Sequence, residues 1–237
     1  MKSIAIIGTD TNVGKTIVTA GIYNSLKKLK LNVEAQKWIS TGDTYNFSDD
    51  LKFVYQIEKL NNAQNIFAKY NFNIIIQPEN NPYSFKIPCS PHLAQKLENK
   101  KIQISKIIKS YNYFQDKCDF LLIETAGGLF SPLNEKYNFA DLLKKLNLPV
   151  ILVIKNVLGA INQTMLNYHY LKSNKIKLSA LVFNNYFSEK KYIQTENINY
   201  LLAKIKPQYY MTLNKIQTKK SLLKNFTDFS KALLRYN

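Results

Sequence analysis

Residues 8–16, Gly-Thr-Asp-Thr-Asn-Val-Gly-Lys-Thr, constrain the fold more than any other part of this chain. They fit the pattern G-x-x-x-x-G-K-(S/T), follow the apolar run at residues 2–7 and precede a helix-like segment at residues 16–31. A strand that turns through glycines into a helix is the context in which this pattern cradles phosphates, because backbone N–H groups point inward at a positive helix end. The pattern predicts that Lys15 reaches the phosphates and that Thr16 places a hydroxyl on Mg²⁺.

The rest of the chain alternates short apolar runs with segments of helical periodicity. Runs rich in Val, Ile and Leu, typical of strands covered on both faces, occur at residues 4–7, 32–37, 119–124, 149–154 and 178–183. Helical periodicity occurs at residues 16–31, 139–146, 161–173 and 190–204. This alternation predicts an α/β fold of the P-loop NTPase type, with a mostly parallel central sheet and helices on both faces. We expect residues 1–237 to form one domain, in which residues 41–117 resemble an insertion with helices near 50–60 and 102–114.

The charge balance raises the question of a polyanionic partner. The formal net charge is +17, and the positive charge is almost all lysine, because Arg235 is the one arginine. Arginine is favoured for bidentate recognition of phosphates and bases, so the composition favours a solvated lysine-rich surface over a nucleic-acid face. Cys89 and Cys118 fit no zinc spacing, and no apolar run approaches the roughly 20 residues that cross a bilayer. We expect a cytoplasmic protein without a nucleic-acid or membrane partner.

Charged side chains end two of the predicted strands. Ligands of α/β sheets bind beyond the carboxyl ends of strands, so Lys37 could face the same pocket as Lys15. Taken alone, a solvated lysine is the simpler interpretation of Lys37. Glu124 ends another strand, before Gly127 and Gly128, and a carboxylate in this position commonly holds Mg²⁺. An ordinary strand-end carboxylate is the alternative.

Two further pairs of polar residues have open interpretations. Asp49 and Asp50 offer another oxygen ligand for a metal, or a helix cap. Asn184 and Asn185 follow a predicted strand, and an amide there suits the edge of an adenine as well as it suits a turn.

Several ordered motifs resemble those of the dethiobiotin synthetase family. Residues 8–16 resemble that family's form of the phosphate loop, G-T-D-T-x-V-G-K-T. The other matching segments are 37–42 (K-P-x-x-S/T-G), 48–49 (S-D), 81–85 (N-P-Y-x-F), 90–92 (S-P-H), 124–128 with 131–133 (E-(G/T)-A-G-G…P-L), 158–162 (L-G-x-I-N) and Asn184. The form of the phosphate loop and the order of the motifs make the resemblance specific.

The resemblance implies a homodimeric α/β ATPase that closes a ureido ring on 7,8-diaminononanoate with CO₂, ATP and Mg²⁺. In that family the diamine forms a carbamate with CO₂, ATP phosphorylates the carbamate, and the second amine displaces phosphate to give dethiobiotin. The residues fit this chemistry. An anionic carbamate attacks an anionic γ-phosphate, and Lys15 and Lys37 would neutralise the developing charge.

The resemblance also assigns roles to individual residues. Lys15 and Lys37 would be catalytic, and Thr16, Asp49 and Glu124 would hold the metal, with Asp50 an alternative to Asp49 because the register of that loop is loose. The nucleotide would contact Asn12, Val13, Gly14, Lys15, Thr16, Ile17, Asp49, Glu124, Thr125, Ala126, Gly127, Asn184 and Asn185. The substrate would contact Thr11, Lys37 and Thr41 and, across the dimer interface, Gly159, Ala160, Ile161 and Asn162.

The chain departs from the family pattern at several positions. Trp38 replaces a proline, Asn12 stands where Glu is frequent, and Asn185 stands where Asp is common. Residues 211–214 occupy the place of a G-x-I-P segment that flanks the base. These departures leave the base selectivity open, and they do not touch the phosphate chemistry.

The main alternative is a P-loop partition or positioning ATPase that binds DNA or membrane. The lysine excess favours it weakly, but such proteins usually carry an extra lysine early in the phosphate loop, where this chain has Thr9 and Asp10. A GTPase would need an N-K-x-D motif, which residues 184–187 do not supply. A non-catalytic binding module, the third class, accounts poorly for Lys37 and Glu124 beside an intact phosphate loop.

Overall fold

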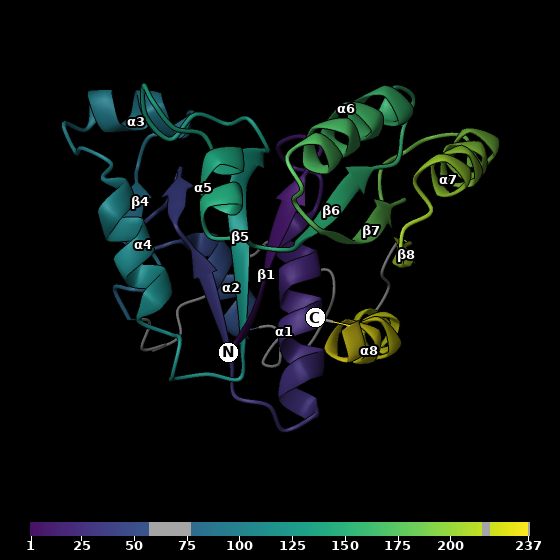
Figure 1. Cartoon of the computed structure of the whole chain (residues 1–237), viewed down its shortest axis with the longest axis horizontal. Helices are drawn as coiled ribbons and strands as arrows, with labels where there is room; N and C mark the ends of the chain where they lie inside the picture. The colour runs from purple at the N-terminus through teal and green to yellow at the C-terminus, as the bar shows by residue number, and fades with distance from the viewer. Residues whose placement is uncertain (57–76, 215–218, 237) are drawn as a thin grey trace.

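The computed structural model describes residues 1–56, 77–214 and 219–236. Its centre is a six-stranded sheet in the order β2-β5-β1-β6-β7-β8, and every neighbouring pair in it is parallel (Figure 1). The strands are β1 (Lys2–Gly8), β2 (Val33–Lys37), β5 (Phe120–Gly128), β6 (Val150–Lys155), β7 (Leu178–Asn184) and β8 (Tyr209–Leu213). A separate parallel pair is formed by β3 (Ile39–Thr41) and β4 (Tyr83–Phe85).

Helices cover both faces of the sheet, each over its own apolar cluster. Ile4 and Ile6 of β1 pack on one face with the helices α1 (Lys15–Lys28), α2 (Asp49–Gln56) and α8 (Lys219–Tyr236). Ala5 and Ile7 pack on the other face with α3 (Pro91–Leu97), α4 (Ile104–Asn112), α5 (Phe139–Lys145), α6 (Ala160–Ser173) and α7 (Lys191–Ile205). Successive side chains of a strand point to opposite faces, so an unbroken apolar run serves both clusters. The predicted α/β fold is confirmed.

The structure differs from the sequence-based prediction in several short elements and in α8, the longest helix among the described residues. The predicted elements do not include β3, β4, β8, α3 or α8. The strands β3 and β4 have three residues each, which is too short to show an alternation of apolar and polar side chains. β8 is the last strand of the sheet, so no described strand covers its outer side. The predicted helix 50–60 begins as α2, and residues 57–60 lie outside the described residues. Within the described part of the chain, no helix is both long and apolar enough to cross a bilayer.

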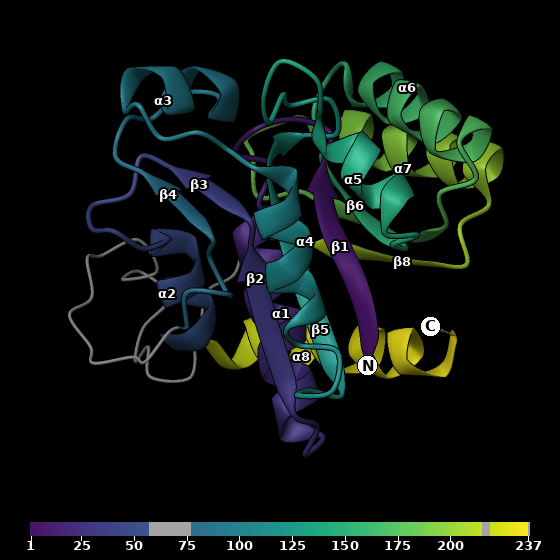
Figure 2. The same cartoon turned by 60° about the vertical axis from the view of Figure 1, so that its left-hand side comes forward.

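The topology places two charged residues together at one edge of the sheet. β5 lies between β1 and β2, and the register pairs Lys37 with Glu124 across β2 and β5. Neighbouring residues in a parallel register project to the same face, so these side chains lie side by side. β1 ends at the same edge and runs through residues 9–14 into α1. In Figure 2, α2 lies beside β2, and β3 and β4 lie past the end of β2 that leads into β3.

Candidate active site

The phosphate loop turns from β1 into α1 through a backbone that only glycine fits. Gly14 is the N-cap of α1 and has a φ of 102°, in the left-handed region that side chains rarely adopt. A Cβ on Gly14 would also lie 2.4 Å from Nδ2 of Asn184. The same amide donates to the carbonyl of Val13 at 2.8 Å, which ties the loop to the end of β7. The positive end of the α1 dipole therefore faces the carboxyl edge of the sheet, as an anion site requires.

Lys15 is buried at the first turn of α1. Its ammonium donates to the carbonyl of Asp10 at 3.1 Å, so the side chain folds back over the loop. Burial and the nearby charge of Lys37 lower the pKa of Lys15 to about 8. A buried ammonium in this position gains most from an anion placed on the loop.

A polar cluster beside the loop consists of Thr16, Lys37, Asp50 and Glu124, one residue each from α1, β2, α2 and β5. The Lys37 ammonium donates to Oε1 of Glu124 at 2.8 Å and forms an ion pair with Asp50. The Thr16 hydroxyl lies 2.9 Å from Oε1 of Glu124 and 3.0 Å from Oδ1 of Asp50. Lys37 is 6 % exposed and Glu124 is 1 % exposed, whereas the Asp50 side chain is 42 % exposed. The polar cluster therefore opens to solvent on the Asp50 side.

Within the polar cluster, Lys37 and Asp50 hold each other ionised. Burial acts to lower the pKa of Lys37, but the carboxylates of Asp50 and Glu124 outweigh it and raise that pKa above its ordinary value. Burial acts to raise the pKa of Asp50, but the charge and hydrogen bond of Lys37 hold it below its usual range. A permanent cation therefore lies between two carboxylates at neutral pH.

The polar cluster has the chemistry of a Mg²⁺ site. Oε2 of Glu124 is buried and makes no hydrogen bond, which is unusual for a carboxylate oxygen. A hydroxyl and two carboxylates are the oxygen ligands that Mg²⁺ takes beside bound phosphates. No group of three His, Cys, Asp or Glu suited to a metal occurs among the residues that the structure describes. A metal here would thus rely on Thr16 and the two carboxylates, with phosphates and water completing its shell.

Asp49 does not join the polar cluster, although the sequence makes it the first candidate for the metal. Its Oδ2 accepts from the backbone N–H and the hydroxyl of Thr44 at 2.9 and 2.8 Å, and its Oδ1 accepts from Lys52 at 2.8 Å. The first turn of α2 points Asp50 inward instead. Asp50 is the alternative to Asp49, and the geometry favours it, because adjacent residues of a helix face different directions.

The other predicted nucleotide residues lie along the phosphate loop and the neighbouring strand ends. Thr125 is buried and its hydroxyl donates to the carbonyl of Ile6 at 3.3 Å. Gly127 has a φ of 70°, and Thr11 lies beside it. Asn12 has a φ of 56° at the tip of the loop. Ile17 packs against the core cluster under α1, and Ala126 packs against the cluster on the other face.

Asn184 and Asn185 both make protein contacts at the end of β7. Besides its bond to Val13, Asn184 accepts the N–H of Tyr186 at 3.0 Å. Asn185 accepts from Asn156 at 2.7 Å and donates to Asn214 at 3.0 Å. The Asn185 amide thus links Asn156, which follows β6, to Asn214, which follows β8.

The predicted substrate residues come from separate elements. Thr41 ends β3, close in sequence to Lys37 at the end of β2. Gly159 is the N-cap of α6 with a φ of 90°, and a Cβ placed on it would meet nothing within 4 Å. Ala160 is buried, Ile161 is half-buried and Asn162 is exposed. The start of α6 therefore presents an open surface.

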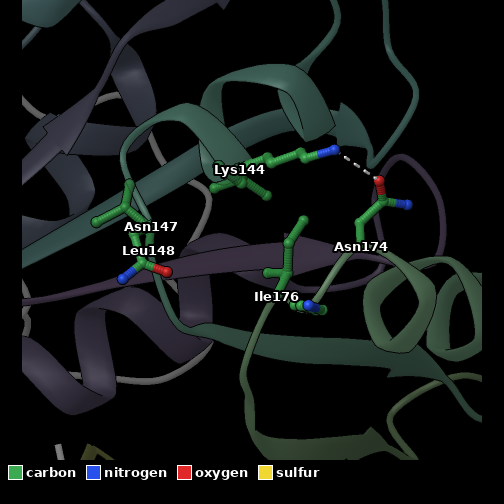
Figure 3. A pocket seen from close by; sticks show the side chains of 7 residues that line it. Lys144, Asn147, Leu148, Asn174 and Ile176 are labelled. Atoms are coloured by element: carbon green, nitrogen blue, oxygen red, sulfur yellow. Dashed lines mark hydrogen bonds between the residues drawn. The ribbon is translucent and has the colours of Figure 1, made fainter.

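A small hollow elsewhere on the molecule has the wrong position for a substrate site. It lies between the loops that lead into β6 and β7 and is lined by Leu143, Lys144, Asn147, Leu148, Asn174, Lys175 and Ile176 (Figure 3). Lys144 donates across it to Asn174 at 3.2 Å. These loops precede the amino ends of the strands, whereas α/β sheets bind ligands at the carboxyl ends.

Comparison with known proteins finds close relatives along most of the chain. A family model described as an AAA domain matches residues 2–218. The chain is 35% identical over 217 residues to the ATP-dependent dethiobiotin synthetase of Fusobacterium nucleatum, covering 90% of this chain and 91% of that protein. It is 38% identical over 186 residues to ATP-dependent dethiobiotin synthetase BioD 2 of Haemophilus influenzae, covering 78% and 92%.

Solved structures with the same fold are more distant in sequence. The MinD cell division protein of Aquifex aeolicus superposes with a TM-score of 0.60 at 12% identity, covering 100% of this chain and 98% of that one. A plasmid partition protein of Borrelia burgdorferi gives a TM-score of 0.57 at 18% identity, covering 100% and 99%. At these identities the likeness shows the P-loop NTPase fold alone.

Proposed function

Since the chain belongs to the family of ATP-dependent dethiobiotin synthetases, we propose that it is a cyclo-ligase that closes a ureido ring on 7,8-diaminononanoate with CO₂ and ATP. The observation that carries the proposal is the polar cluster beside the phosphate loop. Lys37 lies there between two carboxylates, next to the hydroxyl of Thr16 in the first turn of α1.

The proposed reaction has a charge problem that this arrangement answers. One amine of the diamine takes up CO₂ and loses a proton, which leaves a carbamate. A carbamate oxygen then attacks the γ-phosphorus of ATP and ADP leaves, after which the second amine attacks the carbamoyl carbon and expels phosphate. Lys37 would stabilise the carbamate and the transferring phosphoryl group, and Lys15 would hold the phosphates. No protein nucleophile is required.

We propose that Thr16, Asp50 and Glu124, rather than Asp49, hold a Mg²⁺ ion when the nucleotide is bound. The unpaired buried oxygen of Glu124 supports this assignment. Bound Mg²⁺ would supply positive charge to the phosphate oxygens. With the metal in place, the protein's own contribution is to keep the two carboxylates oriented and Lys37 charged between them.

We further propose that two copies of the chain pair through the start of α6. Leu158, directly before the open segment 159–162, is 77 % exposed, and Leu166, about one turn beyond it in α6, is 63 % exposed. Covering exposed apolar side chains of this size with a partner makes the free energy of association more favourable. Sedimentation analysis of the wild type and of Leu158→Asp tests the pairing, and a monomeric wild type would contradict it.

The direct test is phosphate release from ATP with Mg²⁺ and bicarbonate, with and without 7,8-diaminononanoate, and detection of dethiobiotin by mass. We expect phosphate release to depend on the diamine, and the amount of dethiobiotin formed to equal the amount of phosphate released. The Lys15→Ala variant is the negative control. Release stimulated by DNA or lipid vesicles and indifferent to the diamine would instead favour a switch ATPase, the alternative that the lysine excess suggests.

A further inference from the structure

The loop between β3 and α2, residues 42–48, is closed by an internal carboxylate. Asp43 is 7 % exposed, and its Oδ1 accepts the backbone N–H of Asp49 at 3.2 Å. Its Oδ2 accepts the hydroxyls of Ser40 and Ser84, the latter at 2.5 Å. Asp43 therefore joins β3, β4 and the first residue of α2 through one side chain.

The closure is reciprocal. While Asp43 binds the N–H of Asp49, the Asp49 side chain returns to the start of the loop and accepts the N–H of Thr44 at 2.9 Å. Two opposed bonds between side chain and backbone fix both ends of the loop, as in a capping box. The next residue along the chain is Asp50, whose carboxylate meets Lys37 and Thr16.

Asn81 provides a second anchor for the same turn. Its Nδ2 donates to the carbonyl of Lys37 at 2.6 Å, and its Oδ1 accepts the N–H of Ser48 at 3.0 Å. The residue before α2 is thereby tied to the end of β2, the strand that carries Lys37. The side chains of Asp43 and Asn81 together thus fix the position of the start of α2 relative to Lys37.

The placement of Asp43 is costly for a purely structural contact. Burial raises the pKa of Asp43, and the hydrogen bonds from Ser40, Ser84 and Asp49 oppose that rise. Asp43 accepts these hydrogen bonds from neutral donors, and such bonds only partly replace the hydration that a buried carboxylate loses.

We propose that Asp43 is a positioning residue, which holds the first turn of α2 so that Asp50 stays at Lys37 and Thr16. It acts through Asp50, and it touches neither nucleotide nor substrate. The inference rests on the proposed function in one respect, the role of Asp50 as a Mg²⁺ ligand. Partners behind metal ligands commonly change metal affinity about 10- to 100-fold when they are removed.

The test measures the Mg²⁺ concentration that half-saturates binding of a fluorescent ATP analogue, without diamine. We expect Asp43→Ala to raise this concentration at least about tenfold. Asp43→Asn keeps an oxygen for the N–H of Asp49, and the serine hydroxyls can accept from its amide, so we expect it to stay within about threefold of the wild type. Thermal unfolding of each variant shows whether it is folded.

Two comparisons separate positioning from general loosening. Asp141 caps α5 by accepting the N–H of Asn138 at 2.8 Å, so Asp141→Ala removes a similar capping bond and should leave the Mg²⁺ dependence unchanged. In an Asp50→Ala background, Asp43→Ala should have little further effect, because the residue that it positions is gone.

The inference is overturned if Asp43→Ala shifts the Mg²⁺ dependence no more than Asp141→Ala does, or if its shift persists in full beside Asp50→Ala. It is also overturned if Asp50→Ala leaves the Mg²⁺ dependence unchanged. Because this assay needs no diamine, failure to form dethiobiotin would count against the proposed function alone.

Discussion

At the scale of single residues, Lys37 is the buried cation of the polar cluster, because its ammonium lies between the carboxylates of Asp50 and Glu124. We expect Lys37→Ala to lower turnover by at least about 100-fold, since the transferring phosphoryl group loses a cation. Nucleotide binding should be largely kept, because it relies on the phosphate loop and Lys15. Without Mg²⁺ the free energy of unfolding should also fall, by about 3 kcal/mol, because Glu124 becomes an unpaired buried charge. Steady-state kinetics, nucleotide titration and urea unfolding measure the three effects.

Lys52 provides the matched control for Lys37. It pairs with Asp49 at 2.8 Å on the outer side of α2, where both side chains are partly exposed. Pairs of this kind contribute little, so Lys52→Ala should leave turnover near the wild-type value and change stability by less than about 1 kcal/mol. Near-normal turnover of Lys37→Ala would remove Lys37 from the proposed mechanism.

The two cysteines differ in their environment, and a thiol reagent should tell them apart. Burial and the charge of Glu34 raise the pKa of Cys118 to about 11, whereas Cys89 is only half-buried. At pH 8 roughly one Cys118 in a thousand is a thiolate, the form that reacts. We expect iodoacetamide to modify Cys89 first, and Cys118 to react about tenfold faster for each pH unit between 7.5 and 9.5. Mass spectrometry of the Cys89→Ser variant isolates Cys118, and a rate independent of pH would contradict the raised pKa.

Part of the residue-level site follows from the sequence. Lys37 and Glu124 end strands of a parallel sheet, and their register pairing makes them neighbours. The choice between Asp49 and Asp50 does not follow, because it depends on the turn that Asp43 and Asn81 hold, and Asn81 lies 33 residues from its partner Ser48. Local patterns carry no information about such contacts.

At the scale of the elements, the contact between α1 and α8 depends on Gly21, which lies inside α1. A Cβ on Gly21 would lie 2.1 Å from the ring of Phe226, which is fully buried. Alanine would favour the helix by about 1 kcal/mol, but the clash should outweigh this gain. We expect Gly21→Ala to lower the free energy of unfolding by about 1–3 kcal/mol in urea titrations.

A double variant shows whether the clash is the cause. In a Phe226→Ala background the ring is absent, so Gly21→Ala should become neutral or stabilising there. A stabilising effect of Gly21→Ala in the wild-type background would mean that α8 packs on α1 less closely than the structure shows.

The core strands and the longer helices between them could be predicted from the sequence, whereas α8 and the contacts that fix the short elements could not. The core strands are continuous apolar runs, so their positions follow from composition. Trp38, which replaces a proline of the family pattern, shows what such patterns do not predict. Its ring N–H donates to Gln36 at 3.0 Å, and Gln36 in turn donates to the carbonyls of Glu79 and Ser110, both at 2.8 Å. That network satisfies a buried tryptophan next to Lys37, and it draws on segments that a local pattern does not connect.

At the scale of the whole molecule, nucleotide binding can be tested independently of the predicted homodimer, because the phosphate loop and the polar cluster lie within one chain. A chain with a net charge of +17 could attract nucleotides without a specific site. Specific and non-specific binding differ in their effect on stability, because only a ligand that prefers the native state raises the melting temperature at low concentration.

We therefore expect Mg²⁺ and ATP at about 100 times the dissociation constant to stabilise the protein by about 2.7 kcal/mol. For a chain of this size that corresponds to a rise of roughly 5–10 °C in Tm, measured by calorimetry. The Lys15→Ala variant should lose most of the rise, although its net charge changes by only one. A rise that persists in Lys15→Ala, or that disappears at 0.3 M salt in the wild type, would show that surface lysines rather than the phosphate loop hold the nucleotide, since surface pairs are screened at that salt and buried ones much less.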